Sequence, residues 1–310
     1  MTKRTGFLMA FGSYFLYSMN SPIARRAFLD GMQVDTLLAY RFTIGALLFV
    51  LTITLTNLGK ATNDEKPMDR FGIVAGLGSG LLNGIAIYLF FHSLNLLPAS
   101  FAAVLGIGFF VIMVIVLLTI FGEEFTLLRG LRLIVGLAGV WFMVGPSGEL
   151  GSIGVIWLAI GSSCFALHMI TMQWYLSEYN TWTVATIVVC STAVLLLGLW
   201  LFTGLTSGSI DFAIPSFYSW VAVIFLAVCS SWIGRFFSYR AVAILGSGEL
   251  ALLTPTETLL AIIWSVLFLG EWLQPLQWLG AFLVIAGVGL VGLKSLYDNK
   301  VGPVRVVAAD

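Results

Sequence analysis

The stretch SGELALLTPTETLLAIIWSVLFL, residues 247–269, is an apolar run long enough to cross a lipid bilayer. A crossing helix needs about 20 residues, each adding about 1.5 Å. Near the centre of the run, LLTPTETLL (252–260) carries a proline and a carboxylate, Pro255 and Glu257. Because Pro255 has no N–H, a helix that continues through it leaves the carbonyl of Ala251 unbonded. We therefore expect a broken helix that lines a cavity.

The whole chain has the composition of an integral membrane protein. Of its 310 residues, 59% are hydrophobic and 10% are charged, whereas soluble domains contain about 25% charged residues. A formal net charge of zero provides no basic surface for nucleic acid. The three cysteines form no CxxC pair, so neither a disulfide nor a metal site is predicted. We expect no cofactor, and we expect two partners, the lipid bilayer and a small-molecule substrate.

The apolar runs predict ten membrane-spanning helices joined by short connections. The clearest separators are a charged loop at 60–70 and turns at 97–100, 145–148 and 245–248. The first run has no small-residue cleavage site, so it predicts a helix and not a signal peptide. The expected spans are 6–27, 34–56, 71–95, 98–121, 128–145, 151–177, 181–204, 216–244, 247–269 and 276–295.

Lys and Arg residues predict the orientation of the chain, because they concentrate in cytoplasmic loops. With the N-terminus inside, eleven fall on the inner side, only Arg25 and Arg26 fall on the outer side, and Arg41 and Arg235 lie within spans. We therefore expect a multi-pass protein of the inner (plasma) membrane with both termini in the cytoplasm. The inner group comprises Lys3, Arg4, Lys60, Lys66, Arg70, Arg129, Arg132, Arg240, Lys294, Lys300 and Arg305.

The two halves of the chain match each other at an offset of 148 residues. Matching positions include Gly122 and Glu123 with Gly270 and Glu271. Five is an odd number of spans, so the second half must enter the membrane inverted, as in alternating-access transporters. The expected fold is an all-α integral membrane protein of ten transmembrane helices in two inverted five-helix repeats. The expected units are 1–147, 148–296 and a cytoplasmic tail, 297–310.

A known family resembles this pattern. Residues 239–291, YRAVAILGSGELALLTPTETLLAIIWSVLFLGEWLQPLQWLGAFLVIAGVGLV, are similar to the end of an EamA domain of the drug/metabolite transporter superfamily. LPASFAAVL (97–105), IFGEEFT (120–126), GLAGVW (136–141) and TLLAYRF (36–42) echo it in the first half. The resemblance implies two EamA repeats around a central cavity, acting as a secondary transporter, often an exporter. The family motif usually has an apolar or small residue where this chain has Glu257.

Several polar residues fall at one expected depth, and they form the candidate site. A charge at the bilayer centre costs roughly 2.5–3.5 kcal/mol, so such residues usually face a bundle interior or a wet cavity. Counting from the inner turns places Arg235 and Glu257 about 15 Å deep, where they could pair. Arg235 is then either the counter-ion of Glu257 or an anchor for a carboxylate. The candidates for substrate or proton binding are Glu257, Arg235, His168, Thr254, Asn83, Tyr14, Tyr17, Asn20, Tyr239 and Trp264.

A structural role for this layer is the main alternative, with Arg235 and Glu257 as a clamp. The repeat argues for function, because Glu257 corresponds to Phe109 and Arg235 to Ile87. The glycines at every fourth position from 72 to 84 predict close helix packing, with gating as the alternative. Arg41 is expected to act in the scaffold with Asn20 or Ser18, with a place in the outer vestibule as the alternative. Glu271 is expected to be solvated or to brace a loop.

We expect a secondary active transporter that exports a small metabolite such as an amino acid. Ten helices are enough to enclose a cavity, so the protein could act as a monomer. Transport could be coupled to protons. The alternatives are a carrier of drugs or organic cations, a carrier of nucleotide-type metabolites, and a passive channel. An intramembrane enzyme is not expected. The chain has no HExxH motif and no pair of embedded aspartates.

Overall fold

The computed structural model is a bundle of helices, and it describes residues 3–56, 66–120, 127–144, 152–208, 212, 214–251 and 254–298. Among these residues the β-structure is limited to one bridge, between Lys66 and Tyr179. The fold is therefore all-α. The helices are α1 (Lys3–Ser18), α2 (Asn20–Leu29), α3 (Val34–Leu55), α4 (Arg70–Leu96), α5 (Ala99–Ile120), α6 (Leu127–Val144), α7 (Ile153–Tyr175), α8 (Thr181–Ser207), α9 (Phe217–Phe225), the π-helical segment η3 (Leu226–Gly234), α10 (Arg235–Ala251), α11 (Thr254–Leu269) and α12 (Pro275–Asp298).

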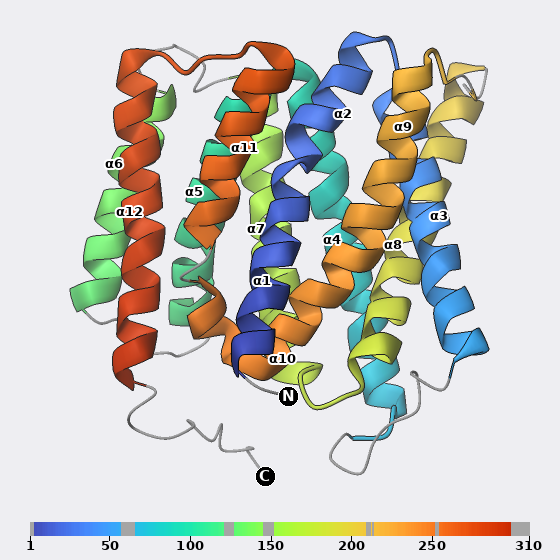
Figure 1. Cartoon of the computed structure of the whole chain (residues 1–310), viewed down its shortest axis with the longest axis horizontal. Coiled ribbons are helices and arrows are strands. Elements are labelled where there is room, and N and C mark those ends of the chain that lie inside the picture. The colour runs from blue at the N-terminus through green and yellow to red at the C-terminus, as the bar shows by residue number, and fades with distance from the viewer. Residues whose placement is uncertain are drawn as a thin grey trace.

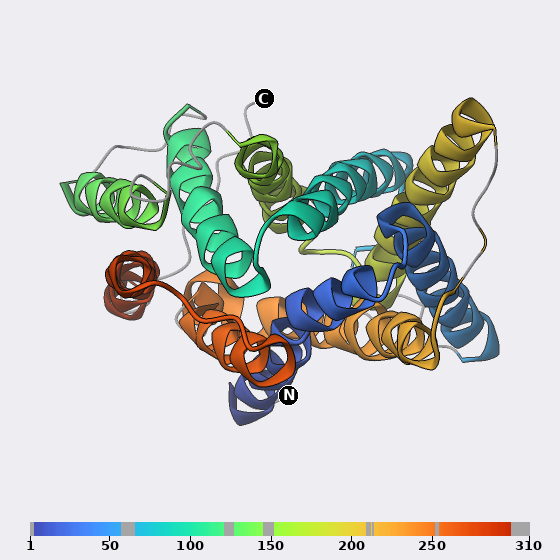
Figure 2. The same cartoon turned by 90° about the horizontal axis from the view of Figure 1, so that it is seen from above.

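The helices stand side by side, with α6 and α12 at one end of the bundle and α3 and α8 at the other (Figure 1). Seen from above, α10 and α11 lie on one side and α4 and α7 on the opposite side (Figure 2). The start of α1 and the end of α12 lie at the same end of the bundle (Figure 1).

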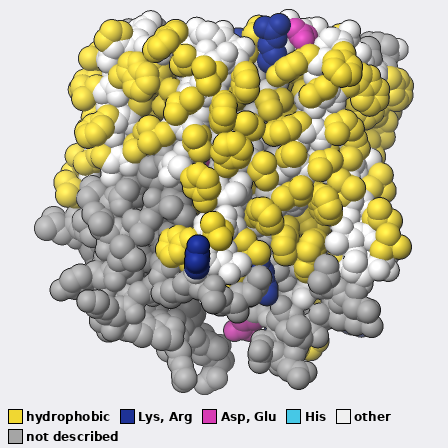
Figure 3. Space-filling model, in the orientation of Figure 1, with side chains coloured by type: hydrophobic (Ala, Val, Ile, Leu, Met, Phe, Trp, Pro, Cys, Tyr) yellow, Lys and Arg dark blue, Asp and Glu magenta, His cyan; other side chains and the backbone are white. Residues whose placement is uncertain are grey.

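Six described segments are long and apolar enough to cross a membrane. Outside the grey atoms, the visible face of the molecule is covered mainly by hydrophobic side chains, which few charged groups interrupt (Figure 3). Exposed hydrophobic side chains of this extent indicate a lipid-facing surface. The protein is therefore a multi-pass membrane protein. The six segments are Val34–Leu55, Arg70–Leu96, Ala99–Leu117, Ile153–Tyr175, Thr181–Ser207 and Phe217–Ala241.

The structure corrects two of the expected boundaries. The span expected at 6–27 is divided at Met19 into α1 and α2. Pro22 lies in the first turn of α2, where its missing N–H is tolerated, and it cannot bond the carbonyl of Ser18.

The second correction concerns the turn expected at 245–248, which was wrong, because α10 remains helical to Ala251. α11 begins at Thr254, so Pro255 falls in a first helical turn, a position that proline favours. The apolar run 247–269 is thus shared between two helices, and the break expected before Pro255 falls on residues 252 and 253, which lie outside the described part of the chain. With 16 residues, α11 is about 24 Å long, shorter than the hydrocarbon core of about 30 Å.

Glycines set the distance between α4 and α8. A Cβ atom at Gly80 would lie 2.6 Å from the Cβ of Ser191 and 2.6 Å from the carbonyl oxygen of Val188. At Gly84 it would lie 2.7 Å from a methyl group of Leu195. The glycine ridge of α4 therefore packs directly against α8, as the four-residue spacing predicted, and brings polar groups of the two helices within bonding distance.

Candidate functional site

A buried polar cluster centres on Asn83 of α4. Its side chain is fully buried, and its Nδ2 donates to Thr192 Oγ1 of α8 at 2.9 Å. Thr192 Oγ1 in turn donates to the carbonyl of Gly80 at 2.8 Å. The close approach of α8 at Gly80 thus makes these two bonds possible. The amide oxygen of Asn83 remains available for a donor from another helix.

Arg235, the first residue of α10, supplies that donor. Its Nη1 lies 3.1 Å from Asn83 Oδ1 and 3.2 Å from the hydroxyl of Tyr239, one turn further along α10. The side chain is only 7% exposed. No carboxylate among the described side chains lies within ion-pair distance of it. These two hydrogen bonds engage Nη1, but no described carboxylate balances the positive charge of the guanidinium.

His168 of α7 lies beside the same face of α4. Its Nδ1 is 2.7 Å from Ser79 Oγ and 3.1 Å from the carbonyl oxygen of Ser79, one turn before Asn83. The ring is fully buried, and Nε2 has no hydrogen-bond partner in the structure. Either tautomer therefore leaves one polar atom of the ring unused. A buried polar atom without a partner is uncommon in native proteins and calls for an explanation. We call Ser79, Asn83, His168, Thr192, Arg235 and Tyr239 the central cluster.

Glu257 does not pair with Arg235, so that expectation was wrong. It lies in the first turn of α11 and is partly exposed. It forms no ion pair or hydrogen bond with any described residue. The expected depth assumed a turn at 245–248, whereas α10 is helical to Ala251. At a helix N-terminus, free N–H groups and the helix dipole favour a carboxylate without a cation.

The other candidate residues divide between this region and simple packing. The hydroxyl of Tyr17 is close enough to Arg235, Tyr239 and Glu257 to interact with each electrostatically. Trp264 Nε1 donates to Ser18 Oγ at 3.1 Å, and its ring stacks on Phe268.

Tyr14 and Thr254 complete the placement of the candidates on α1 and α11. Tyr14 packs in a small apolar cluster with Ala10, Ala241 and Leu245. The side chain of Thr254 lies outside the described residues. The structure thus brings Asn83, Arg235, Tyr239, His168 and Tyr17 together. It places Tyr14 beside α10 and joins Trp264 to Ser18 of α1.

Arg41 of α3 forms a second buried cationic group. It is 3% exposed, and its Nε and Nη2 donate to Ser231 Oγ at 2.8 Å and Ser230 Oγ at 2.9 Å. Nη2 also lies 3.4 Å from Asn20 Oδ1, as the sequence suggested, whereas Ser18 bonds elsewhere. Nη1 is buried without a partner. Both serines belong to η3.

The model of the EamA-like transporter family matches the chain twice, over residues 4–145 and 152–293. The chain belongs to the EamA-like transporter family. One solved crystal structure is similar over 96% of this chain and 99% of its own, with a TM-score of 0.64 and 17% sequence identity. At that identity the similarity supports the fold alone. No curated protein matches the chain.

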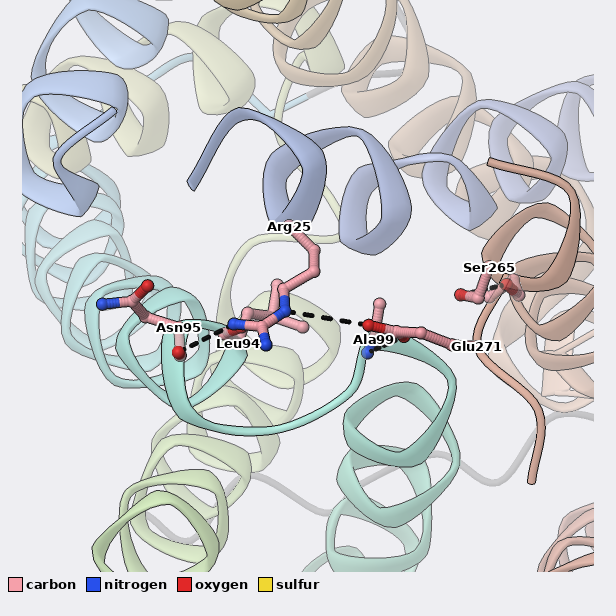
Figure 4. A network of polar contacts seen from close by, with 7 residues as sticks. Arg25, Leu94, Asn95, Ala99, Ser265 and Glu271 are labelled. Atoms are coloured by element: carbon pink, nitrogen blue, oxygen red, sulfur yellow. Dashed lines mark hydrogen bonds and ion pairs between the residues drawn. The ribbon is translucent and has the colours of Figure 1, made fainter. Parts of the chain in front are cut away.

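This EamA-like transporter also has a polar network near the end of α4, which joins its two halves (Figure 4). Arg25 Nη1 donates to the carbonyls of Leu94 at 2.9 Å and Asn95 at 2.7 Å. Its Nε lies 3.8 Å from Glu271 Oε1, and Glu271 Oε2 accepts from the backbone N–H of Ala99 at 2.6 Å. We call these five residues the rim network.

The rim network follows from the charges of helix ends. Arg25 meets the carbonyl end of α4, and Glu271 meets the N–H end of α5, and both placements are favourable to the helix dipole. Gly270, with φ of +66°, ends α11 in the left-handed conformation that glycine tolerates best. Glu271 therefore braces a loop, as its position in the sequence indicated.

Sequence reasoning missed four polar residues of the candidate site in this EamA-like transporter. Ser79, Thr192 and the serine pair of η3 each contact a charged or amide side chain of the central region. Serine and threonine are common in membrane helices, where they also bond their own backbone. Only the spacing of Ser79 and Asn83, which places them on one face of α4, offered a signal.

Proposed function

We propose that this EamA-like transporter is a secondary active carrier of a small polar metabolite, with the central cluster as its substrate site. The observation that carries the proposal is a buried hydrogen-bonded set drawn from four helices, α4, α7, α8 and α10, inside a membrane-spanning bundle. Polar and ionisable groups at such positions usually mark a substrate or ion pathway. His168 Nε2 and Arg41 Nη1 are donor or acceptor positions that a substrate would fill.

The proposed architecture is two inverted repeats of five spans each, in units 1–147 and 148–296 followed by a cytoplasmic tail, 297–310. The double match to the family model, on either side of residues 146–151, supports this division. Transport would proceed by rocking of one repeat against the other around the site. The Lys and Arg distribution supports placing both termini in the cytoplasm of an inner (plasma) membrane protein, and outward transport is the proposed direction.

Glu257 is assigned a separate role in this proposal. A partly exposed carboxylate at the start of a short helix can exchange a proton or bind a substrate amine, and its lack of a fixed partner supports such a role. Tyr17 interacts electrostatically with both Glu257 and Arg235, and it would couple occupancy of one position to the other.

Flux into proteoliposomes tests the proposal. Purified protein should show saturable transport of at least one small metabolite driven by a gradient, and flux that rises linearly with concentration would indicate a channel instead. Glu257→Gln should remain folded in the membrane while losing transport or its response to pH. Thr206→Ala, which removes an exposed hydroxyl bonded within its own helix, is the control and should transport normally. Full transport by Glu257→Gln with an unchanged pH response would overturn the role of this carboxylate.

A further inference from the structure

The two buried arginines lie close together. Arg41 Nη2 donates to the hydroxyl of Ser230, and the backbone N–H of Arg235 donates to the carbonyl of the same serine. One serine of η3 therefore contacts both residues. The two guanidinium groups also repel each other electrostatically. They belong to α3 and α10, which are far apart in the sequence.

Neither arginine has a carboxylate partner among the side chains that the structure describes. The described carboxylates that form ion pairs lie at the helix ends, where Asp30, Asp35, Asp69 and Glu271 meet Arg26, His92, Lys66 and Arg25 respectively. Arg41 is surrounded instead by hydroxyl groups and by the rings of Phe42 and Phe91, whose centroids are 5.0 and 5.1 Å from its guanidinium carbon. Two like charges in a buried region are unfavourable unless a counter-charge joins them.

Four buried polar atoms of the described side chains have no hydrogen-bond partner, and they belong to Arg25, Arg41, His168 and Trp232. Arg41 Nη1 and His168 Nε2 are the two that belong to the groups considered above. The unbonded atoms are a second observation, separate from the unbalanced positive charge. Both observations indicate that a further negatively charged group belongs beside these side chains. A guanidinium binds carboxylate and phosphate groups with two parallel hydrogen bonds, which its planar fork matches.

We infer that the substrate is a small organic anion whose carboxylate or phosphate group binds between Arg41 and Arg235. This inference rests on the proposed function, because it gives the chemical class of the substrate for the same site. The anion supplies the missing negative charge and accepts from Arg41 Nη1. Arg41 is then a substrate-binding residue in addition to its contacts with the scaffold.

Thermal unfolding of the purified protein in detergent tests the inference. The probes are succinate, inorganic phosphate, choline and sorbitol, each compared with sodium chloride at the same ionic strength. Succinate or phosphate should raise the Tm, and the difference between these two identifies the anionic group. Choline and sorbitol should have no effect. Stabilisation by choline or sorbitol alone, or by no probe, would overturn the inference.

Arginine variants tie the effect to the site. Arg41→Gln and Arg235→Gln should weaken the apparent affinity for the anion more than about tenfold, because each removes a charged, bidentate contact. Arg41→Lys keeps the charge but removes the fork, so it should fold and show an intermediate loss. Arg26→Gln, which removes a half-exposed arginine paired with Asp30, is the matched control and should bind like the wild type.

The two proposals fail in different ways. If a neutral or cationic probe is transported and Asn83→Leu abolishes that flux while Arg41→Gln does not, the carrier function stands and the anion class is wrong. If succinate binds with full dependence on both arginines but no probe shows saturable flux, the anion site stands and the carrier function is wrong. If Arg41→Lys and Arg235→Gln each fold and bind the anion with the affinity of the wild type, the anion site is also refuted.

Discussion

The two ends of α4 differ from its middle in how charge is balanced. At one end Asp69 accepts from the N–H of Gly72 at 2.7 Å, from Tyr179 at 2.8 Å and from Lys66 at 3.1 Å. At the other end Arg25 meets backbone carbonyls and Glu271. In the middle, Asn83 and Ser79 meet a guanidinium and an imidazole, and no described carboxylate pairs with either.

This difference separates stability from function along one helix. The groups at the ends complete helix termini and pair opposite charges, although Arg25 Nε is buried without a hydrogen bond. The groups in the middle are hydrogen-bonded, yet they leave a net positive charge among the described side chains and one unpartnered atom, His168 Nε2. An arrangement whose charges are balanced without a ligand serves the fold, whereas one whose charge is unbalanced without a ligand is suited to binding.

Asn83→Leu should have the largest effect on transport, because it removes the side chain that joins the middle of α4 to Thr192 and Arg235. Leucine has a similar volume but leaves Arg235 Nη1 and Thr192 Oγ1 without the amide. Each unsatisfied buried group costs about 1–3 kcal/mol, and we expect transport to fall by more than about a hundredfold, equal to about 2.8 kcal/mol. Flux in proteoliposomes, normalised to inserted protein, measures this, and flux within twofold of the wild type would contradict the role of the cluster.

His168→Asn should separate the role of Nδ1 in stability from the role of Nε2 in substrate binding. Asparagine keeps a donor near the position of Nδ1, which serves the fold through Ser79, and removes Nε2, which has no partner. We expect a Tm close to that of the wild type and a substrate affinity about tenfold lower, since one hydrogen bond contributes about 0.5–1.5 kcal/mol. A large drop in Tm with unchanged affinity would instead assign His168 to the scaffold.

Glu271→Gln should show the opposite pattern, a loss of stability with little change in substrate affinity. It removes the charge that faces both Arg25 and the N-terminus of α5. The expected cost is about 1 kcal/mol in the free energy of unfolding. Asp30→Asn breaks a more exposed pair, Arg26 with Asp30, and serves as the control with a smaller loss. Equal losses in the two variants would show that the rim network does not bind the two halves together.

Asp69→Asn should have the smallest effect, visible mainly in its pH dependence. The N–H of Gly72, then Tyr179 and Lys66, lowers the pKa of Asp69 to about 2. The ionised carboxylate therefore favours the folded state above the usual pKa of about 4, and this contribution is lost as the pH falls from about 4 towards 2. The Tm of the wild type should fall more than that of the variant over this range, and parallel curves would contradict the assignment.

The sequence predicted the helices and the depth of the candidate site in the membrane better than it predicted the contacts within that site. Counting residues placed Asn83 and Arg235 at one depth, and the structure joins them directly. The same count failed for Glu257, because it depended on a turn at 245–248 where the chain is helical to Ala251. Glycine and serine in a turn-like order do not break a helix whose neighbours hold it in place.

The partners of Arg41 were less accessible to sequence reasoning. Hydropathy identifies a span, but it does not reveal that nine residues of that span adopt wider π-helical turns. Which face of α10 meets α4 depends on those turns. The pairing of Arg235 with Asn83, and the approach of Ser230 and Ser231 to Arg41, therefore required the structure.

The π-helical segment makes the site sensitive to the number of residues that precede it. The N–H of Arg235 bonds the carbonyl five residues earlier, at Ser230, so η3 holds more residues per turn than the α-helices on either side. Deleting one residue within η3 would restore an ordinary helical phase and rotate α10 by about 100° relative to α9. Arg235 would then leave Asn83 although every side chain of the site was still encoded. In homologous chains, an insertion or deletion at this point would therefore change substrate recognition as strongly as a substitution.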